Sequence, residues 1–247
     1  MNVEDAVSEL APSGTLRAGI NLSNFLLVSD RHSSGAPIGV APDMAREIAD
    51  RLGVGLSLVP FSSPGELADA AEKDVWDIGL IAAEPARAET IAFSPAYVEI
   101  EATYLVYDDS PLQMIVDVDQ PGIRIAVSER SAYDLYLTRN LEHASLVRAK
   151  GLPAALELFK REKLDALAGL RPGLIADAVT LVGSRILDGR FTAVQQAVGT
   201  VVTKQFGAAF LSDFIKDARS SGLIERLIDR HGMAGSLLAV GRLREDF

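Results

Sequence analysis

The sequence predicts an α/β fold arranged as two compact units, and three observations support this prediction. Short apolar strands alternate with amphipathic helices along most of the chain, which is typical of layered α/β proteins. A chain of 247 residues with 48% hydrophobic residues lies near the length at which one core splits into two. Residues 108–122 hold turn formers and alternating acids, and a new series of strands and helices follows them.

The first predicted unit begins with the strand TLRAGI at residues 15–20. Residues 42–53 then place apolar side chains on one helical face and end at a glycine, which predicts a helix with a glycine stop. LSLVPF at residues 56–61 predicts the next strand. Ser63 with Pro64 predicts the capped start of another helix.

Residues 76–83 (WDIGLIAA) are apolar enough to form a central parallel strand that is buried on both faces. A short turn of helix is expected after Pro85, and IEATYLVY at 100–107 predicts an extended segment. The second unit is predicted to contain a strand, a helix, a strand, a helix and a strand, at residues 122–128, 131–143, 144–149, 153–163 and 164–170. A strand at 198–204 and helices at 206–222 and 223–232 follow.

Composition excludes several classes of function. A net charge of -10 and an isoelectric point near 4.8, without any Lys/Arg-rich run, argue against a nucleic-acid partner. The chain has no cysteine, so disulfides and zinc–thiolate sites are excluded. The histidines His32, His143 and His231 lie far apart without metal-ligand spacing. We therefore expect neither a metal nor a cofactor.

The first residues carry acids where a secretory signal needs a basic segment followed by an apolar run. No stretch approaches 18 apolar residues, so no membrane insertion is expected. Two localisations stay open. The protein is periplasmic if an export signal has been removed from this sequence, and cytoplasmic if Met1 is the native start.

Several local strings, taken in order, resemble the type II periplasmic solute-binding proteins, in particular the polar amino-acid-binding family of ABC transporters. They are IGVAPDMAREIADRLG (38–53), PARAETIAFSPAY (85–97), KLDALAGL (163–170) and the strand with two helices at 198–232. The resemblance implies lobe 1 at residues 1–106 and 197–247 and lobe 2 at 107–196. Two crossing strands would form a hinge, and the ligand would be trapped in the cleft between the lobes.

The resemblance implies that Arg87 grips a ligand carboxylate, which a guanidinium does with two parallel hydrogen bonds. Where the family usually places a hydroxyl residue three positions earlier, this chain has Glu84. Three interpretations of Glu84 are open. It recognises a ligand amine, or it neutralises an arginine, or it only begins the short helical turn, where an acid is favoured.

In lobe 2 the family's Gly-Ser/Thr pair corresponds to Arg130-Ser131, so the serine is kept and a cation is added. Ser131 could offer its hydroxyl and backbone N–H groups to an anion, or serve only as a helix cap with Asp134 completing a capping box. The family usually places an acid that holds the ligand amine at a position that lies near Leu170-Arg171 in this chain. The ligand is therefore either a rearranged zwitterion, with its amine on Glu84, or a molecule with several acidic groups that Arg130 and Arg171 receive.

Phe25 lies where the family usually places an aromatic residue that covers the ligand, and the nearby Asn21 and Asn24 offer amide donors and acceptors. The family's Pro-Pro-Phe run is absent here, so this resemblance is partial.

Three functions are consistent with these residues. The first is a monomeric, non-catalytic binding protein that delivers a small anionic or zwitterionic ligand to an ABC permease. The second is an enzyme, because the resembled family includes cyclohexadienyl and arogenate dehydratases, and Glu84 could act as a general acid. The positive charge of Arg87 favours an ionised Glu84 and argues against that role. The third is a soluble ligand sensor.

Overall fold

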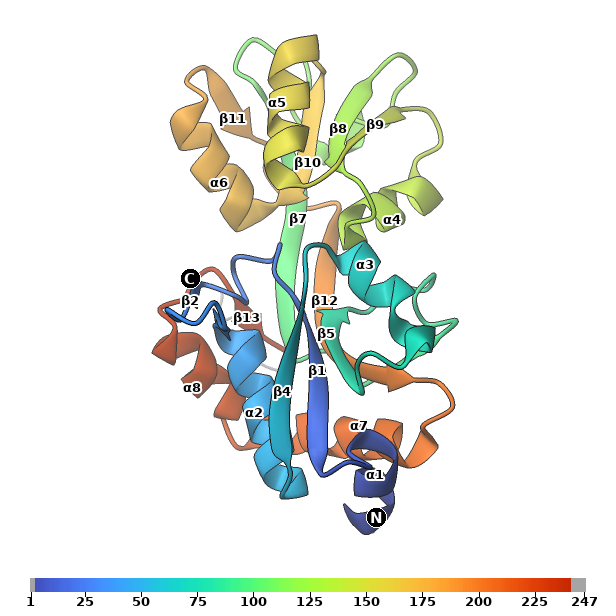
Figure 1. Cartoon of the computed structure of the whole chain (residues 1–247). Coiled ribbons are helices and arrows are strands. Elements are labelled where there is room, and N and C mark those ends of the chain that lie inside the picture. Colours follow the sequence, from blue (N-terminus) through green and yellow to red (C-terminus); the bar gives the residue numbers. More distant parts are fainter. Residues whose placement is uncertain (1–2, 241–247) are drawn as a thin grey trace. The chain divides into compact units, whose positions relative to one another are not determined.

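The computed structural model describes residues 3–240, and the chain divides into two compact units. Unit 1 comprises residues 1–99 and 195–247, and unit 2 comprises residues 100–194. Two strands, β7 (Val98–Tyr107) and β12 (Thr192–Val201), carry the chain across the two boundaries. The ribbon of the whole chain is drawn in Figure 1.

Unit 1 is built on a mixed sheet with helices around it. β1 pairs in parallel with β4 and β5, and β12 runs antiparallel to β5 and to β6. In Figure 1, α2 and α3 lie on either side of β1 and β4. The elements of unit 1 are α1 (Val3–Leu10), β1 (Thr15–Asn21), β2 (Asp30–Arg31), β3 (Pro37–Ile38), α2 (Val40–Leu52), β4 (Gly55–Phe61), α3 (Pro64–Asp69), η1 (Ala71–Lys73), β5 (Ile78–Ala82), β6 (Ile91–Phe93), α7 (Gln205–Ser220), α8 (Leu223–Arg230) and β13 (Leu238–Ala239).

Unit 2 is a smaller mixed sheet. β8 lies between β9 and β10 and pairs in parallel with both, while β10 and β11 run antiparallel to β7. The remaining elements of unit 2 are η2 (Ile115–Asp117), β8 (Arg124–Ser128), α4 (Ala132–Asn140), β9 (Ser145–Ala149), α5 (Leu152–Glu162), β10 (Ala166–Leu170), α6 (Arg171–Thr180) and β11 (Ser184–Ile186).

The predicted elements of both units are confirmed, with some changes. Ser63 caps α3 by accepting the Glu66 backbone N–H at 3.2 Å, as its position before Pro64 predicted. The last predicted strand is longer and starts earlier, because β12 runs from residue 192. Two helices, α1 and α6, were not predicted, and they have only 8 and 10 residues. The expected helical turn after Pro85 is a run of hydrogen-bonded turns.

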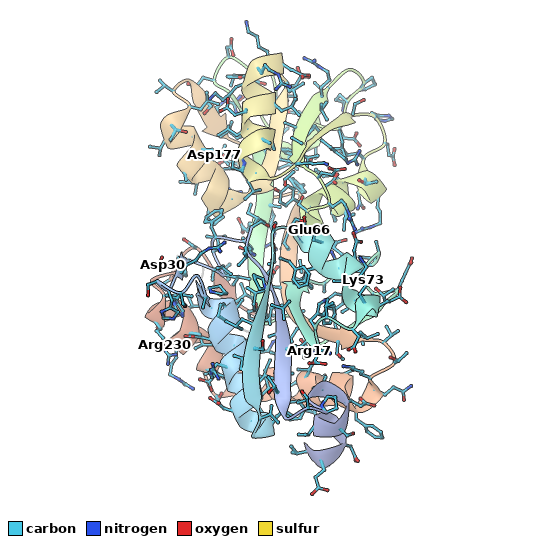
Figure 2. The ribbon with its side chains drawn as sticks, in the orientation of Figure 1. Arg17, Asp30, Glu66, Lys73, Asp177 and Arg230 are labelled. Carbon is cyan, nitrogen blue, oxygen red and sulfur yellow. The ribbon has the colours of Figure 1, made fainter. Side chains whose placement is uncertain are left out.

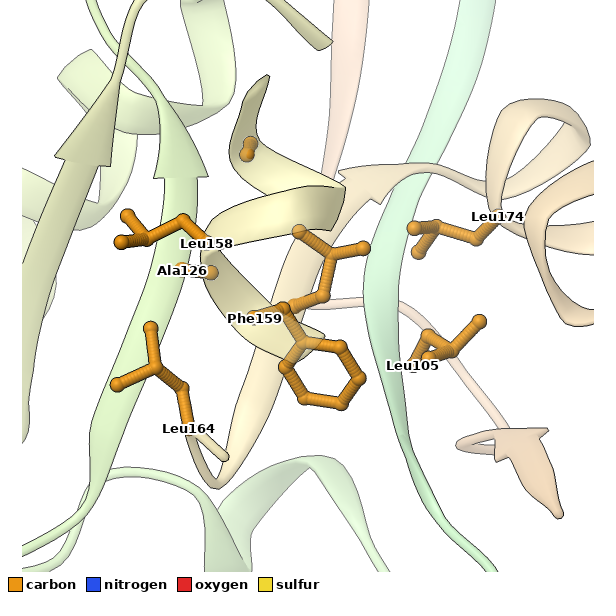
Figure 3. Packing of buried hydrophobic residues seen from close by; sticks show 8 residues of the cluster. Leu105, Ala126, Leu158, Phe159, Leu164 and Leu174 are labelled. Carbon is orange, nitrogen blue, oxygen red and sulfur yellow. The ribbon is translucent and has the colours of Figure 1, made fainter. Parts of the chain in front are cut away.

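Each unit has its own core. In unit 1, Trp76 is buried against Leu67 and Ile81 and donates its indole N–H to the Leu67 carbonyl at 3.1 Å. In unit 2, Phe159 of α5 packs among the residues shown in Figure 3, including Leu105 of β7 and Leu174 of α6. Burying apolar surface contributes about 25 cal/mol per Å2, so these clusters are the main favourable term in folding each unit.

Candidate functional site

The turn that carries the predicted anion-binding arginine follows a fully buried strand. All five residues of β5 are buried, and the chain then turns back before β6 begins. The carbonyl of Glu84 accepts the backbone N–H groups of Arg87 and Ala88 at 2.9 and 3.0 Å. The Arg87 carbonyl accepts the N–H of Ile91 at 3.0 Å, which leads the chain into β6. Hydrogen bonds on both sides therefore fix the backbone of Arg87.

The Arg87 side chain is buried, with only 4% of its surface exposed. One guanidinium nitrogen, Nη1, donates to the Ala82 carbonyl at 2.8 Å. This bond holds the guanidinium at the carboxyl end of β5. Burying a cation is costly unless hydrogen bonds and opposite charge compensate, and the Ala82 carbonyl supplies one such hydrogen bond.

The loop after β1 holds the other predicted residues of unit 1. The Asn21 side-chain oxygen accepts the Ser23 N–H at 3.1 Å and the Ser23 hydroxyl at 2.8 Å. The Asn24 side-chain oxygen accepts the Leu26 N–H at 3.3 Å. Both asparagine oxygens thus shape the loop, as short polar side chains do in turns. Phe25 directly follows Asn24 and remains 42% exposed.

A glycine fixes this loop against the start of α2. Gly39 has φ +152°, and a Cβ there would lie 2.2 Å from the Leu27 carbonyl oxygen. That oxygen also accepts the Ala41 N–H at 3.0 Å. No larger residue fits at position 39, so the loop that presents Phe25 is held tightly by the backbone of the helix start.

The predicted residues of unit 1 come to one edge of its sheet. β1 and β5 are parallel neighbours, and the loop holding Phe25 follows β1 while the turn holding Arg87 follows β5. Carboxyl ends of parallel strands lie at the same edge, which is where α/β proteins commonly bind ligands. The structure therefore brings Asn21, Asn24, Phe25, Glu84 and Arg87 to one edge of unit 1.

In unit 2, Ser131 caps α4. Its hydroxyl accepts the Asp134 backbone N–H at 3.1 Å, as a helix cap does, but Asp134 Oδ2 accepts the Arg130 N–H at 2.7 Å. The expected capping box is therefore incomplete, because the Ser131 N–H donates to the Ser128 carbonyl instead. Asp134 Oδ1 also accepts from Arg148 Nε of β9 at 2.9 Å. Arg148 could not be predicted as a partner of Asp134, because this contact depends on the pairing of β9 with β8.

Arg130 holds an unusual backbone conformation. Its φ of +58° lies in the left-handed region, which costs a residue with a Cβ about 1–2 kcal/mol. The family's glycine at this position would carry no such cost. An arginine kept in a strained position at a helix start is consistent with a role for its side chain, because backbone strain often persists at functional sites.

Arg171 begins α6 directly after β10, so it shares the carboxyl edge of unit 2 with Arg130 and Ser131. Its Nε lies 2.8 Å from Glu101 Oε2 of β7, and its Nη2 donates to the Gly189 carbonyl. Sequence reasoning missed Glu101, which is 70 residues away along the chain. The sequence offers only a weak hint, because Glu101 is one of two acids, with Glu99, in a mostly apolar strand.

Two residues of the signature FSPAY are structural. Ser94 is buried, and its hydroxyl accepts the Val198 N–H at 3.1 Å and donates to the Pro95 carbonyl at 2.9 Å. Tyr97 is fully buried, and its backbone N–H donates to the Gln196 carbonyl. Both residues attach the segment after β6 to β12.

A separate cavity of about 490 Å3 lies in unit 2, and none of the predicted site residues lines it. Lys160 and Lys163 at the end of α5 line one wall, where cations complement the negative end of a helix. The position of the helix end therefore explains why these two lysines lie there.

Residues 3–240 contain no group of three or more His, Asp or Glu side chains arranged to hold a metal ion. Over the same residues, no helix is both long enough and apolar enough to cross a membrane.

Comparison with known proteins identifies the family. The sequence model of the family described as "Bacterial extracellular solute-binding proteins, family 3" matches residues 17–234. The chain therefore belongs to this family. A curated relative, the cyclohexadienyl dehydratase of Pseudomonas aeruginosa, is 28% identical over 148 residues, or 58% of this chain and 54% of the relative. The matched region thus spans about half the length of that relative.

Solved structures share the fold. ArgBP from T. maritima matches with a TM-score of 0.73 and 22% identity over 92% of this chain and 99% of that chain. An amino acid ABC transporter substrate-binding protein from Streptococcus pneumoniae, bound to L-arginine, matches with a TM-score of 0.73 and 20% identity. This match covers 95% of this chain and 99% of that chain. An ancestral amino acid-binding protein, a precursor of cyclohexadienyl dehydratase, matches with a TM-score of 0.74 and 19% identity. This match covers 91% of this chain and 97% of that chain. These likenesses establish the type II periplasmic-binding-protein fold predicted from the sequence.

Proposed function

We propose that this chain is the substrate-binding protein of an ABC transporter and binds a small, amino-acid-like molecule through its carboxylate. The observation that carries the proposal is the buried guanidinium of Arg87, fixed to the Ala82 carbonyl at the carboxyl edge of unit 1. A carboxylate can accept two parallel N–H bonds from such a group. The family to which the chain belongs and the amino-acid-binding proteins that share its fold support this choice.

The contacts of Arg171 bear on the kind of ligand. A ligand with several acidic groups would need Arg171 as a receiving cation, but this guanidinium already bonds Glu101 and Gly189. Breaking a partly buried ion pair to admit a ligand would offset much of the gain. We therefore favour a zwitterionic ligand whose carboxylate binds Arg87 and whose amine binds Glu84. The two-lobe trap and its closure remain predictions.

A thermal-shift screen tests this proposal. The purified chain is heated with amino acids, dicarboxylates, aromatic acids and opines, and a ligand should raise the melting temperature in proportion to ln(1 + [L]/Kd). Replacing Arg87 by Ala should weaken binding by on the order of 100-fold or more, because it removes a charged hydrogen-bonding partner. Arg51→Ala is the control, since Arg51 forms an exposed ion pair with Asp217 in the same unit. Equal stabilisation of all three proteins would contradict the proposal.

A second candidate function is a dehydratase. The sequence match to a cyclohexadienyl dehydratase favours it, and Glu84 beside Arg87 is the carboxyl group that would donate the proton to a leaving hydroxyl. Incubation with prephenate and with arogenate tests this candidate. Loss of substrate that disappears in Glu84→Gln would support catalysis, and no loss above a protein-free blank would remove it.

Delivery to a permease requires the protein outside the cytoplasm. We propose a periplasmic location, which the extracellular description of the family supports. Cell fractionation of the native host followed by mass spectrometry of the mature N-terminus tests this point. Recovery only in the cytosol would favour the sensor function instead.

A further inference from the structure

The chain enters unit 2 between residues 99 and 100 and leaves it between residues 194 and 195. A cluster of charged groups lies close to both points. Glu101 stands on β7 just after the first crossing, and Gly189 and Arg190 precede β12 and the second crossing. Glu101 and Gly189 are 88 residues apart in the sequence (189 − 101), but both belong to unit 2. The residues around Glu101 and those around Gly189 are the two stretches that the following contacts join.

Arg171 joins the two stretches. Its Nε donates to Glu101 Oε2 at 2.8 Å, and its Nη2 donates to the Gly189 carbonyl. Arg190 Nη1 lies 3.7 Å from Glu101 Oε1, so the carboxylate faces two guanidinium groups. The Glu101 and Arg171 side chains are 17% and 26% exposed, so water screens their pair less than a fully exposed pair.

The position of Arg171 requires such a partner. It is the first residue of α6, a helix with no side-chain cap and no acid in its first turn. A cation at the positive end of a helix is electrostatically unfavourable. Glu101 from the neighbouring strand supplies the negative charge that the first turn of the helix lacks.

Other contacts tie the same two stretches together. The Thr103 hydroxyl lies 3.1 Å from the Gly189 carbonyl and 3.2 Å from the Leu187 carbonyl. The Phe191 N–H donates to the Ala102 carbonyl at 3.1 Å. The rings of Tyr104 and Phe191 lie 4.6 Å apart. Arg171 adds hydrogen bonds that attach both stretches to the start of α6.

We propose that Arg171 is a positioning residue that, with Glu101 and Gly189, locks together the two points at which the chain enters and leaves unit 2. Bending of the chain between the units is then confined to residues outside the segment from Glu101 to Arg190. This role replaces the ligand contact expected from the sequence. It goes beyond the proposed function and does not depend on which ligand binds.

Hydrogen exchange of the full chain, measured by mass spectrometry without ligand, tests the proposal. Arg171→Gln and Glu101→Gln should each speed exchange roughly tenfold in peptides covering residues 99–105 and 187–194, since both remove the same coupling. The double variant, Arg171→Gln with Glu101→Gln, should exchange about as fast as either single variant, because each single change already breaks the pair. Arg161→Gln is the control, because Arg161 is exposed and pairs only with the adjacent Glu162.

Arg171→Lys is the mildest variant and guards against misfolding. A lysine keeps the charge but cannot reach Glu101 and Gly189 with a planar fork, so exchange in the two peptides should rise about threefold. The proposal is overturned if the single variants leave both peptides unchanged, if faster exchange spreads evenly over unit 2, or if the double variant exchanges much faster than either single variant.

Discussion

The two units hold their charged residues in different ways. In unit 1, Asp77 is 1% exposed and binds Arg17 and Lys204, and Arg87 is almost equally buried. In unit 2, the carboxylate of Glu101 and the guanidinium of Arg171 keep partial contact with water. Buried charges are more sensitive to the loss of a partner than exposed ones. Asp77 and Arg87 of unit 1 are strongly desolvated, and so is Asp134 of unit 2. Glu101 and Arg171, in contrast, keep contact with water and secure the backbone of unit 2.

The largest expected effect is that of Asp77→Asn. Arg17 lies on β1 (Figure 2), and its guanidinium and backbone N–H both donate to Asp77 at 2.9 Å. Removing the carboxylate charge leaves Arg17 and Lys204 without it, and we expect a loss of about 2–3 kcal/mol of unfolding free energy. Urea unfolding at pH 7 measures this loss. A change below 0.5 kcal/mol would break the comparison between the units.

The same residue gives a pH dependence. Burial alone would raise the pKa of Asp77, but hydrogen bonds from Arg17 and then Lys204 hold it below its usual value. A carboxyl group with a lowered folded pKa contributes stability that is present above its unfolded pKa and is lost as pH falls through the folded pKa. The difference in stability between the unmodified chain and Asp77→Asn should therefore shrink as pH falls below about 4.

Ser131→Ala is expected to cost about 1 kcal/mol, the usual contribution of a helix cap. Ser63→Ala is its matched partner in unit 1, because Ser63 caps α3 with the same kind of bond. If Ser131 acts only as a cap, both variants lose similar stability and keep the ligand-dependent rise in melting temperature. Loss of that rise in Ser131→Ala alone would show that unit 2 also contacts the ligand through this hydroxyl.

Arg130→Gly should stabilise unit 2 by about 0.5 kcal/mol, because glycine adopts a positive φ without the cost borne by arginine. Lys163→Gly is the control, since Lys163 also has a positive φ of 47° at the end of α5. Differential scanning calorimetry measures both. A gain at Lys163 with a loss at Arg130 would reveal a stabilising role for the Arg130 side chain.

The smallest expected effect is that of Asp177→Asn on α6 (Figure 2). Burial raises the pKa of Asp177 above its usual value, the opposite of Asp77. An acid with a raised folded pKa opposes folding once it is ionised, so its cost is absent below the unfolded pKa and grows as pH rises through the folded pKa. Asp177→Asn should thus stabilise the chain by a few tenths of a kcal/mol at pH 7 and have no effect near pH 3. Thermal melts at both pH values test this, and destabilisation at pH 7 would contradict it.

Most of the fold could be predicted from sequence, because strands such as β5 and helices such as α2 have strong local patterns. The helix α6 could not, since Arg-Pro-Gly at its start and apolar residues on both of its sides give no clear period. At the site, Arg87 and Ser131 could be predicted to lie at the carboxyl edge of their sheets, because each of them comes soon after the end of a predicted strand. The partner of Arg171 did not, because Glu101 reaches it only through the antiparallel pairing of β10 with β7.

The central claim is that Arg87 is the anion-binding arginine, whereas Arg171 is held by its own unit. The most direct test compares Arg87→Gln and Arg171→Gln in thermal melts with the compound that most stabilises the unmodified chain. We predict that the ligand-dependent rise in melting temperature disappears in Arg87→Gln and survives in Arg171→Gln. A rise that survives in Arg87→Gln, or that disappears only in Arg171→Gln, would contradict the claim.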